Sequence, residues 1–339
     1  MNKPASTRLG RREFLTSLGA IASATALGAP QLLAALNPDA GKNAAGIPQR
    51  ILGRTGAKIT ILGLGSAPIG HSMPGAAVGI PVYRAALEAG INYVDTARIY
   101  DDAEQYLGEL MPQWRDKIFL TTKAWPGGDD PKAAAERMRL SFEESLRLLR
   151  TDHVDLLHIH SANDSDPAMI LASGGPLEFA RKMKEKGLTR FIGITGHNRP
   201  ARFAPVLDTG EIDVLMTALN FADYHQYPFE ETILPIARKH KCGILAMKVF
   251  GGHINGFPGY KNRGPSRMPK EFLESSLRYS LGIEGVAGAV VGVYGVEEVR
   301  QNVEWVKHWK RLGKKEVAAL REEGKKLVST WGPRFGPLA

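Results

Sequence analysis

Cysteine is nearly absent from this sequence, since Cys242 is the single one among 339 residues. An intrachain disulfide and a cysteine-based metal cluster are therefore excluded. A basic stripe with interleaved aromatic residues is missing as well, although the formal net charge is +9. The densest basic run, Lys307–Lys326, also contains acidic residues and is typical of a solvated helix face, so we predict no nucleic-acid partner.

The N-terminus has no apolar stretch long enough for a membrane span. Its apolar run extends from Leu15 to about Ala29, which is too short to cross a bilayer as a stable helix. The run follows the twin-arginine pattern Arg11-Arg12-Glu13-Phe14-Leu15 and leads into alanine-rich sequence that ends at Ala35. Basic, apolar and small residues in this order are typical of an export signal.

We therefore predict a twin-arginine signal peptide at residues 1–35, with the translocation machinery as a partner. The mature protein would be periplasmic and would have no stable membrane anchor. The signal carries +3 of the formal charge, so the mature chain is only moderately basic. Cleavage near Ala29 and cleavage after Ala35 both fit the small residues there. The alternative for the whole segment is a disordered basic tail with a chance arginine pair.

From Thr60 onward, short apolar runs alternate with amphipathic helical stretches. The runs are apolar throughout, as expected of parallel strands buried on both faces. They end about 22 to 44 residues apart, which is the size of a βα unit. The eight runs are Ile61–Leu64, Tyr93–Val94, Ile118–Leu120, Val154–Ile159, Phe191–Ile194, Val214–Met216, Ile244–Met247 and Ala287–Val291. Eight such units predict an α/β protein with the (β/α)8 TIM-barrel fold.

A doubly wound open sheet is the alternative fold. A dinucleotide-binding sheet of that kind needs a helix directly after the glycine-rich turn of its first strand, because the helix N-terminus binds the phosphates. Here the first run ends in Gly63–Pro68, and the sequence predicts no helix directly after it. The barrel is therefore favoured.

Shorter segments flank the predicted barrel. Residues 36–47 are rich in Ala, Gly and Asn and are predicted to be a linker. Two short β segments around a glycine-containing turn in Arg50–Ile59 predict a β-hairpin. The barrel domain then covers residues 48–331, and residues 332–339 form a C-terminal tail. The Gly- and Pro-rich segment Gly251–Pro269 is predicted to be a long loop that shapes a pocket.

Four polar residues stand where strands of such a barrel end. Asp95, Lys123 and His160 close or follow apolar runs, and Tyr100 comes five residues after Asp95. Catalytic groups of such barrels lie at these strand ends. A lysine at the barrel mouth needs a partner, which Asp95 can supply. A lysine near a phenol also lowers the phenol's pKa from its ordinary value of about 10.

This set of residues suits proton transfer to a carbonyl group. Tyr100 can donate the proton, and His160 can orient the carbonyl with a second hydrogen bond. None of the four is a nucleophile and their spacing fits no metal site, so hydride from a nicotinamide is the evident electron-pair donor. His158 points to the same side as His160 and is predicted to be a hydrogen-bonded interior histidine. The alternative for the whole set is structural ion pairs and caps.

Seven motifs occur in the order Arg50-x-Leu52-Gly53-Arg54-Thr55-Gly56, Gly63-Leu64-Gly65, Asp95-Thr96-Ala97-x-x-Tyr100-x-x-x-Glu104-x-x-Leu107-Gly108, Thr122-Lys123, Val154-Asp155-Leu156 with His160, Gly193-Ile194-Thr195 and Gly292…Glu298…Asn302. In these motifs the sequence resembles the aldo-keto reductase family over residues of about 48–331. The resemblance implies a (β/α)8 barrel that reduces aldehydes and ketones with NAD(P)H. It also implies that Asp95, Tyr100, Lys123 and His160 are its catalytic residues.

The resemblance further implies a set of residues that bind the dinucleotide. They are Gly65, Ser66, Asp95, Thr195, Asn198, Asn220, Lys248, Phe250, Gly251, Gly292, Glu298 and Asn302. Thr195, Asn198 or Asn220 would bind the carboxamide, because the thioether of Met216 cannot replace the usual glutamine amide. Glu298 stands where Arg or Gln is usual and would repel a 2′-phosphate. NAD is thus favoured over NADP, unless Arg300 restores phosphate binding.

The sequence departs from the family directly after Tyr100, where Asp101 replaces a common glycine. This carboxylate would oppose loss of the phenol proton or alter substrate access. The predicted function is reduction of a small carbonyl substrate by an exported enzyme whose cofactor is loaded in the cytoplasm. An alternative is a nicotinamide-binding sensor or binding protein with little turnover, which a compartment poor in NAD(P)H favours. A non-redox barrel enzyme such as an isomerase is a third.

Overall fold

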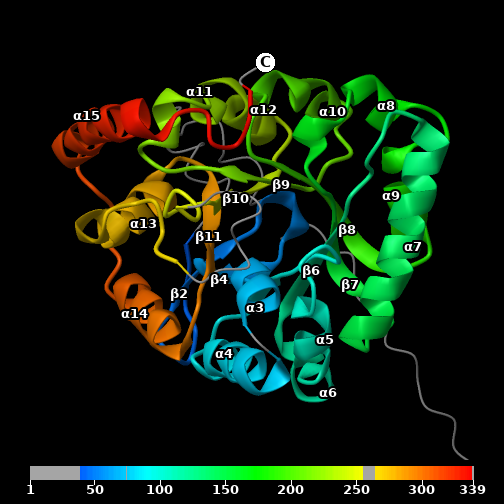
Figure 1. Cartoon of the computed structure of the whole chain (residues 1–339), viewed down its shortest axis with the longest axis horizontal. Helices are drawn as coiled ribbons and strands as arrows, with labels where there is room; N and C mark the ends of the chain where they lie inside the picture. Colours follow the sequence, from blue (N-terminus) through cyan, green and yellow to red (C-terminus); the bar gives the residue numbers. More distant parts are fainter. Residues whose placement is uncertain (1–38, 74, 255–263, 338–339) are drawn as a thin grey trace, which may run out of the picture. The chain divides into compact units, whose positions relative to one another are not determined.

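The computed structural model describes residues 39–73, 75–254 and 264–337. Eight parallel strands close into a barrel in the order β10-β11-β4-β5-β6-β7-β8-β9 (Figure 1). The predicted (β/α)8 fold is confirmed, and the open doubly wound sheet is wrong. The predicted signal peptide lies outside the described residues, as does part of the predicted loop Gly251–Pro269.

The eight predicted apolar runs correspond to the eight barrel strands. These are β4 (Leu62–Gly65), β5 (Tyr93–Asp95), β6 (Phe119–Ala124), β7 (Val154–Ile159), β8 (Thr189–Gly196), β9 (Val214–Ala218), β10 (Gly243–Met247) and β11 (Val286–Gly292). The helices are α3 (Ala67–Ser72), α4 (Ala76–Glu88), α5 (Ala103–Gly108), α6 (Met111–Trp114), α7 (Pro131–Leu149), α8 (Pro167–Leu171), α9 (Pro176–Glu185), α10 (Ala204–Asp208), α11 (Phe229–Thr232), α12 (Leu234–Lys239), α13 (Leu273–Gly282), α14 (Val296–Lys307) and α15 (Lys314–Trp331). The longer helices, such as α7, α9 and α14, lie outside the ring of strands (Figure 1).

Local sequence explains where α7 begins and ends. The Asp130 side chain accepts a hydrogen bond of 2.7 Å from the backbone N–H of Ala133, and Pro131 occupies the first turn, where its missing N–H is not needed. The helix ends at Leu149, and the next residue, Arg150, takes the left-handed conformation. One expectation is wrong: the sequence predicted no helix directly after the first barrel strand, but α3 follows β4 directly. Pro68 is compatible with this helix because it lies in the first turn.

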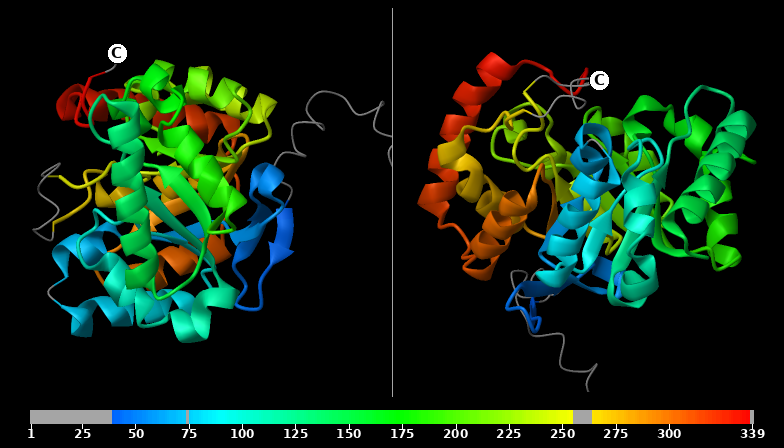
Figure 2. Two further views of the ribbon diagram at one scale, coloured as in Figure 1. Left: turned by 90° about the vertical axis from the view of Figure 1, so that its right-hand side faces the viewer. Right: turned by 60° about the horizontal axis from the view of Figure 1, so that its bottom comes forward.

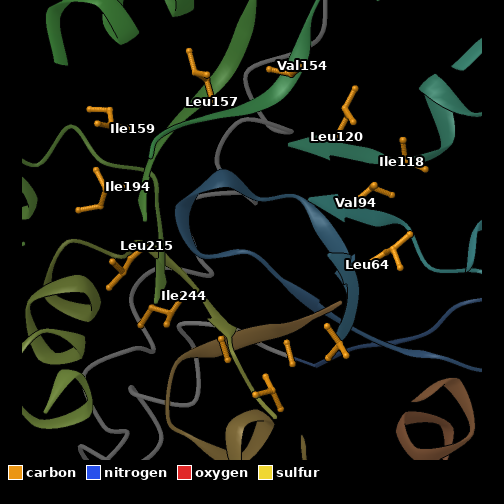
Figure 3. Close-up of a cluster of buried hydrophobic side chains, with 14 of the residues drawn as sticks. Leu64, Val94, Ile118, Leu120, Val154, Leu157, Ile159, Ile194, Leu215 and Ile244 are labelled. Atoms are coloured by element: carbon orange, nitrogen blue, oxygen red, sulfur yellow. The ribbon is translucent and has the colours of Figure 1, made fainter. Parts of the chain in front are cut away.

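Alternation along the strands separates two apolar cores. On one face, residues such as Leu64, Leu120 and Ile244 pack outward against the helices, and Figure 3 shows them spread over consecutive strands. On the other face, residues such as Phe119 and Leu156 fill the barrel interior. Successive side chains of a strand point to opposite faces, so the two cores are built from alternate positions of the same strands.

A small antiparallel sheet precedes the barrel. It has the order β1-β2-β3, with β1 at Asp39–Lys42, β2 at Pro48–Ile51 and β3 at Lys58–Thr60. The β2–β3 pair is the predicted hairpin, whereas β1 lies within the segment predicted to be a linker. Leu52 and Ile59 of this region pack into the inner core, so the sheet covers one end of the barrel (Figure 2).

Residues 332–337, the described part of the predicted C-terminal tail, pack on the barrel. Arg334 makes an ion pair of 2.5 Å with Asp223, and both side chains are buried. Its Nε also donates to the carbonyl oxygen of Gly251. Local composition does not reveal these contacts, because both partners lie more than 80 residues away in the sequence. Within the described ranges, no helix is long and apolar enough to cross a membrane.

Candidate active site

Strand alternation brings Asp95, Lys123 and His160 to the interior of the barrel. Tyr93, Phe119 and Leu156 fill the inner core near the start of β5, β6 and β7. Asp95 lies two residues beyond Tyr93, while Lys123 and His160 lie four residues beyond their counterparts. Even spacing keeps all three side chains on the inward face, at the carboxyl ends of neighbouring strands.

Lys123 is the centre of the hydrogen-bonded group. Its Nζ lies 2.5 Å from Oδ2 of Asp95, 2.9 Å from the carbonyl oxygen of Thr96 and 3.3 Å from the Tyr100 hydroxyl. The side chain is only 1% exposed and that of Asp95 only 5%. Burial alone would lower the pKa of Lys123, but the charge of Asp95 and the hydrogen bonds to Asp95 and Tyr100 outweigh it and raise the pKa. The lysine is therefore an ammonium group in an ion pair with Asp95.

The Tyr100 phenol differs from the expectation drawn from the sequence. Its pKa lies above the ordinary value, because burial raises it more than the ammonium of Lys123 lowers it. This loss of hydration cannot be predicted from a pattern of residues, because it depends on how deeply the ring is packed. Tyr100 is therefore a neutral phenol at neutral pH and can donate a hydrogen bond or a proton.

Two histidines, one in β7 and one directly after it, lie at different depths of the barrel. His160 packs edge-to-face on Tyr100, with ring centroids 5.9 Å apart. His158 pairs in register with Lys123 one step deeper and is fully buried, and its ring nitrogens find no hydrogen-bond partner among the described residues. Burial lowers the pKa of both rings well below the ordinary value, and the charge of Lys123 acts in the same direction. Both are therefore neutral, and His160 is the one beside the phenol.

A cavity of about 790 Å³ starts at Asp95 and Tyr100 and extends along the ends of β10 and β11 to α14. Its volume lies within the range of ligand sites in proteins. Met247 and Lys248 line it at the end of β10, while Glu298 and Asn302 line it on α14. The backbone of Gly292, at the end of β11, packs closely on the ring of Pro68, since a Cβ atom at Gly292 would lie 2.8 Å from that ring. The cavity is thus an extended groove that joins the buried polar group to a distant helix.

The fold and this arrangement agree with a comparison to protein families. The profile of the aldo/keto reductase family matches residues 61–273, which is more than half of the chain. The chain belongs to the aldo/keto reductase family. It is therefore an NAD(P)-dependent oxidoreductase.

Individual relatives support the assignment over most of the chain. L-galactose dehydrogenase of Arabidopsis thaliana is 28% identical over 313 residues, covering 83% of this chain and 96% of that protein. Among solved structures, an aldo/keto reductase of Klebsiella pneumoniae in complex with NADP and acetate has a TM-score of 0.63 at 20% identity, covering 85% of this chain and 98% of that one. A holo-form aldo-keto reductase of Bacillus halodurans has a TM-score of 0.63 at 21% identity, covering 83% and 96%. At these identities, the two structures support the fold alone.

Most of the residues expected to bind the dinucleotide line the groove of this aldo/keto reductase. They are Gly65, Ser66, Asp95, Lys248, Phe250, Gly292, Glu298 and Asn302. Thr195, Asn198, Asn220 and Gly251 are absent from the described lining. The Asn220 amide instead donates to Asp223 and to the carbonyl oxygen of Lys248, which makes it a support of the loop after β9. Arg300 pairs with Glu297 on the exposed side of α14 and also lies outside the described lining.

Loop residues line the groove as well. His197 is one of them, and the ring of Phe335, which the sequence did not indicate, packs on it at 5.4 Å between centroids. Ser266 and Arg267, in the described part of the loop predicted to shape a pocket, also line the groove. In the described part of the chain, no cluster of three or more His, Cys, Asp or Glu is placed to hold a metal ion. Met216, which stands where the family usually has a glutamine, lies in the inner core.

Proposed function

We propose that this aldo/keto reductase interconverts a small aldehyde or ketone and the corresponding alcohol, with Tyr100 as the general acid for reduction. The contact between Tyr100 and Lys123 at the end of the groove carries this proposal. A bound nicotinamide supplies the hydride. Asp95, Lys248 and Gly292 lie along the groove, where they can hold the dinucleotide, and glycine leaves room for close backbone approach to its phosphates.

Each neighbouring side chain has a role in the proton transfer. The neutral Tyr100 phenol donates to the carbonyl oxygen as negative charge builds there, and Lys123 stabilises the phenolate that results. Asp95 keeps Lys123 charged and oriented at 2.5 Å. His160, neutral and beside the phenol, donates a second hydrogen bond that orients the same oxygen.

The proposal is tested with purified mature protein. Single-turnover transfer is followed with NADH and NADPH on a panel of aldehydes and ketones, and with NAD and NADP on their alcohols. Sugars belong in the panel, because the Arabidopsis relative is named for L-galactose. Transfer to at least one compound is expected. Tight nicotinamide binding without transfer to any of them would favour a sensor or binding protein instead.

We expect NADH to bind at least about tenfold more tightly than NADPH, a difference of about 1.4 kcal/mol. Glu298 lines the groove and accepts a 2.9 Å hydrogen bond from the Tyr294 N–H, so its carboxylate is held where it would repel a 2′-phosphate. Fluorescence titration of both cofactors measures the ratio. Glu298→Gln should reduce it, whereas Glu304→Gln, on the same helix but away from the groove, should not. Tighter NADPH binding by the unaltered protein would refute this preference.

We also propose export by the twin-arginine pathway, which the order of residues in the first 35 positions supports. Replacing Arg11 and Arg12 together by Lys should leave the protein in the cytoplasm at precursor size, while Arg8→Lys should have no effect. Cell fractionation and N-terminal sequencing of the exported form measure both location and cleavage site. Unchanged export of the double variant would show that the arginine pair is not the signal.

A further inference from the structure

The residue after Tyr100 has an unusual backbone conformation. Asp101 has φ +44°, in the left-handed region that favours glycine. Its backbone is fastened there, because Arg98 donates to the Asp101 carbonyl oxygen at 2.8 Å and pairs with the buried Glu104 at 3.1 Å. Residues held in sparsely populated backbone regions cluster at functional sites. The question is what the Asp101 carboxylate contacts.

The carboxylate of Asp101 faces His71, on α3. Its Oδ2 lies 2.8 Å from Nδ1 of His71, whose side chain is only 12% exposed. The pKa shift of Tyr100 comes from burial and from the charges of Lys123, Asp95 and Lys248. The side-chain contact of the Asp101 carboxylate is with the histidine ring instead.

His71 in turn packs against the ring of Tyr100. The two rings meet edge-to-face, with centroids 5.6 Å apart and planes inclined by 70°. His160 makes a similar edge contact at 5.9 Å, and Nζ of Lys123 lies 4.7 Å from the centroid of the Tyr100 ring. Tyr100 is thus contacted by three polar side chains, which come from α3, from β6 and from the residue directly after β7.

Helix α3 also fits directly against the backbone of Tyr100. A Cβ atom at Gly70 would lie 1.8 Å from the Tyr100 carbonyl oxygen, so only glycine allows this approach. The neighbouring residue, His71, then reaches the ring while Gly70 contacts the backbone. Two adjacent residues of one short helix therefore constrain both parts of Tyr100.

We propose that His71 is a positioning residue for the reaction: held by Asp101, it fixes the ring of Tyr100 against His160 and so places the phenol hydroxyl at the substrate carbonyl. This inference rests on the proposed role of Tyr100. His71 does not touch the hydroxyl and acts through the ring. Displacement of a reacting group by about 1 Å can lower a rate by about 10²-fold, so a loosened ring should lower kcat rather than cofactor affinity.

The test compares two histidine–aspartate pairs of the same protein. His71→Ala should lower kcat about tenfold and leave the Kd of the nicotinamide unchanged. The matched control is His240→Ala, because His240 pairs with Asp208 at 3.2 Å, with side-chain exposures of 20% and 52% against 12% and 51% for His71 and Asp101. This control should leave kcat unchanged. Equal kcat values for His71→Ala and the unaltered protein would overturn the proposal.

Asp101→Gly separates positioning from stability. Glycine relieves the left-handed strain, so Tm should stay the same or rise, while kcat should fall as in His71→Ala because the histidine has lost its partner. A merely structural pair would lower Tm and leave kcat per folded molecule unchanged. In the Tyr100→Phe background, His71→Ala should change the residual rate by less than about twofold, because its effect passes through the phenol. A further tenfold loss there would refute action through Tyr100.

A measurement without turnover distinguishes this proposal from the proposed function. In protein labelled with ¹³C at the tyrosine Cζ, the Tyr100 signal is assigned by its disappearance in Tyr100→Phe. His71→Ala should shift or broaden that signal, and His240→Ala should not. An unchanged signal overturns the positioning role whatever the activity. A changed signal in a protein that turns over no compound of the panel supports the positioning of the ring and refutes the proposed reaction alone.

Discussion

Replacing Tyr100 by Phe is expected to lower kcat for carbonyl reduction by about 10³-fold, within the range of about 10²- to 10⁴-fold for loss of a general acid. The substitution removes one hydroxyl, which lies 3.3 Å from Nζ of Lys123, and keeps the ring that His71 and His160 contact. Nicotinamide affinity should therefore change little. Single-turnover hydride transfer at saturating cofactor isolates the chemical step from product release.

The control for this experiment is Tyr106→Phe. Tyr106 belongs to α5, directly after the Tyr100 loop, and its hydroxyl donates to Asp102 at 3.1 Å outside the groove. Loss of that hydroxyl should leave the transfer rate within about twofold. Equal rates for Tyr100→Phe and the unaltered protein would exclude Tyr100 as the proton donor.

The direction of the Tyr100 pKa shift sets the pH dependence expected in the same assay. Because burial raises the pKa of the phenol, Tyr100 stays protonated through the neutral range and remains competent as an acid. Reduction should then be insensitive to pH around neutrality. Oxidation of the alcohol needs the phenolate as base and should accelerate as pH rises. Tyr100→Phe should abolish that acceleration.

The part of the site that could be predicted from sequence is the part set by strand periodicity. Asp95, Lys123 and His160 lie at even spacing from apolar residues on the same strands, so the period of two places them inside the barrel. The groove residues on α14, such as Glu298, follow from motif spacing in the same way. Local patterns therefore carry information about residues whose position is set by their own element.

The remaining features depend on contacts between distant segments. Phe335 contacts His197 from a segment whose Arg334 binds Asp223, 111 residues earlier in the chain. His71 approaches Tyr100 because Gly70 allows α3 to contact the Tyr100 backbone. The pKa of Tyr100 likewise reflects burial by several elements at once. No periodicity or spacing encodes such packing, which explains why the sequence alone suggested the opposite shift for the phenol.

Replacing Lys123 by Met is expected to impair both folding and catalysis. Asp95 would remain buried without its ammonium partner, and breaking a buried ion pair in this way lowers the free energy of unfolding by about 3–5 kcal/mol. The kcat for reduction should fall at least about 10²-fold, because the ammonium that lies 3.3 Å from the Tyr100 hydroxyl and stabilises the phenolate would be lost. Urea unfolding and single-turnover transfer measure the two effects separately.

A second substitution separates the two effects. Lys123→Met combined with Asp95→Asn removes the unpaired charge, so most of the lost stability should return, whereas the transfer rate should stay low because the cation is still missing. As a control, Lys182→Met breaks the 2.7 Å pair with Glu178 on the exposed face of α9. Such surface pairs contribute at most about 1 kcal/mol. Its stability and rate should both stay near those of the unaltered protein. Recovery of the transfer rate in the double variant would show that Lys123 acts only by neutralising Asp95, and that Tyr100 transfers its proton without help from the ammonium.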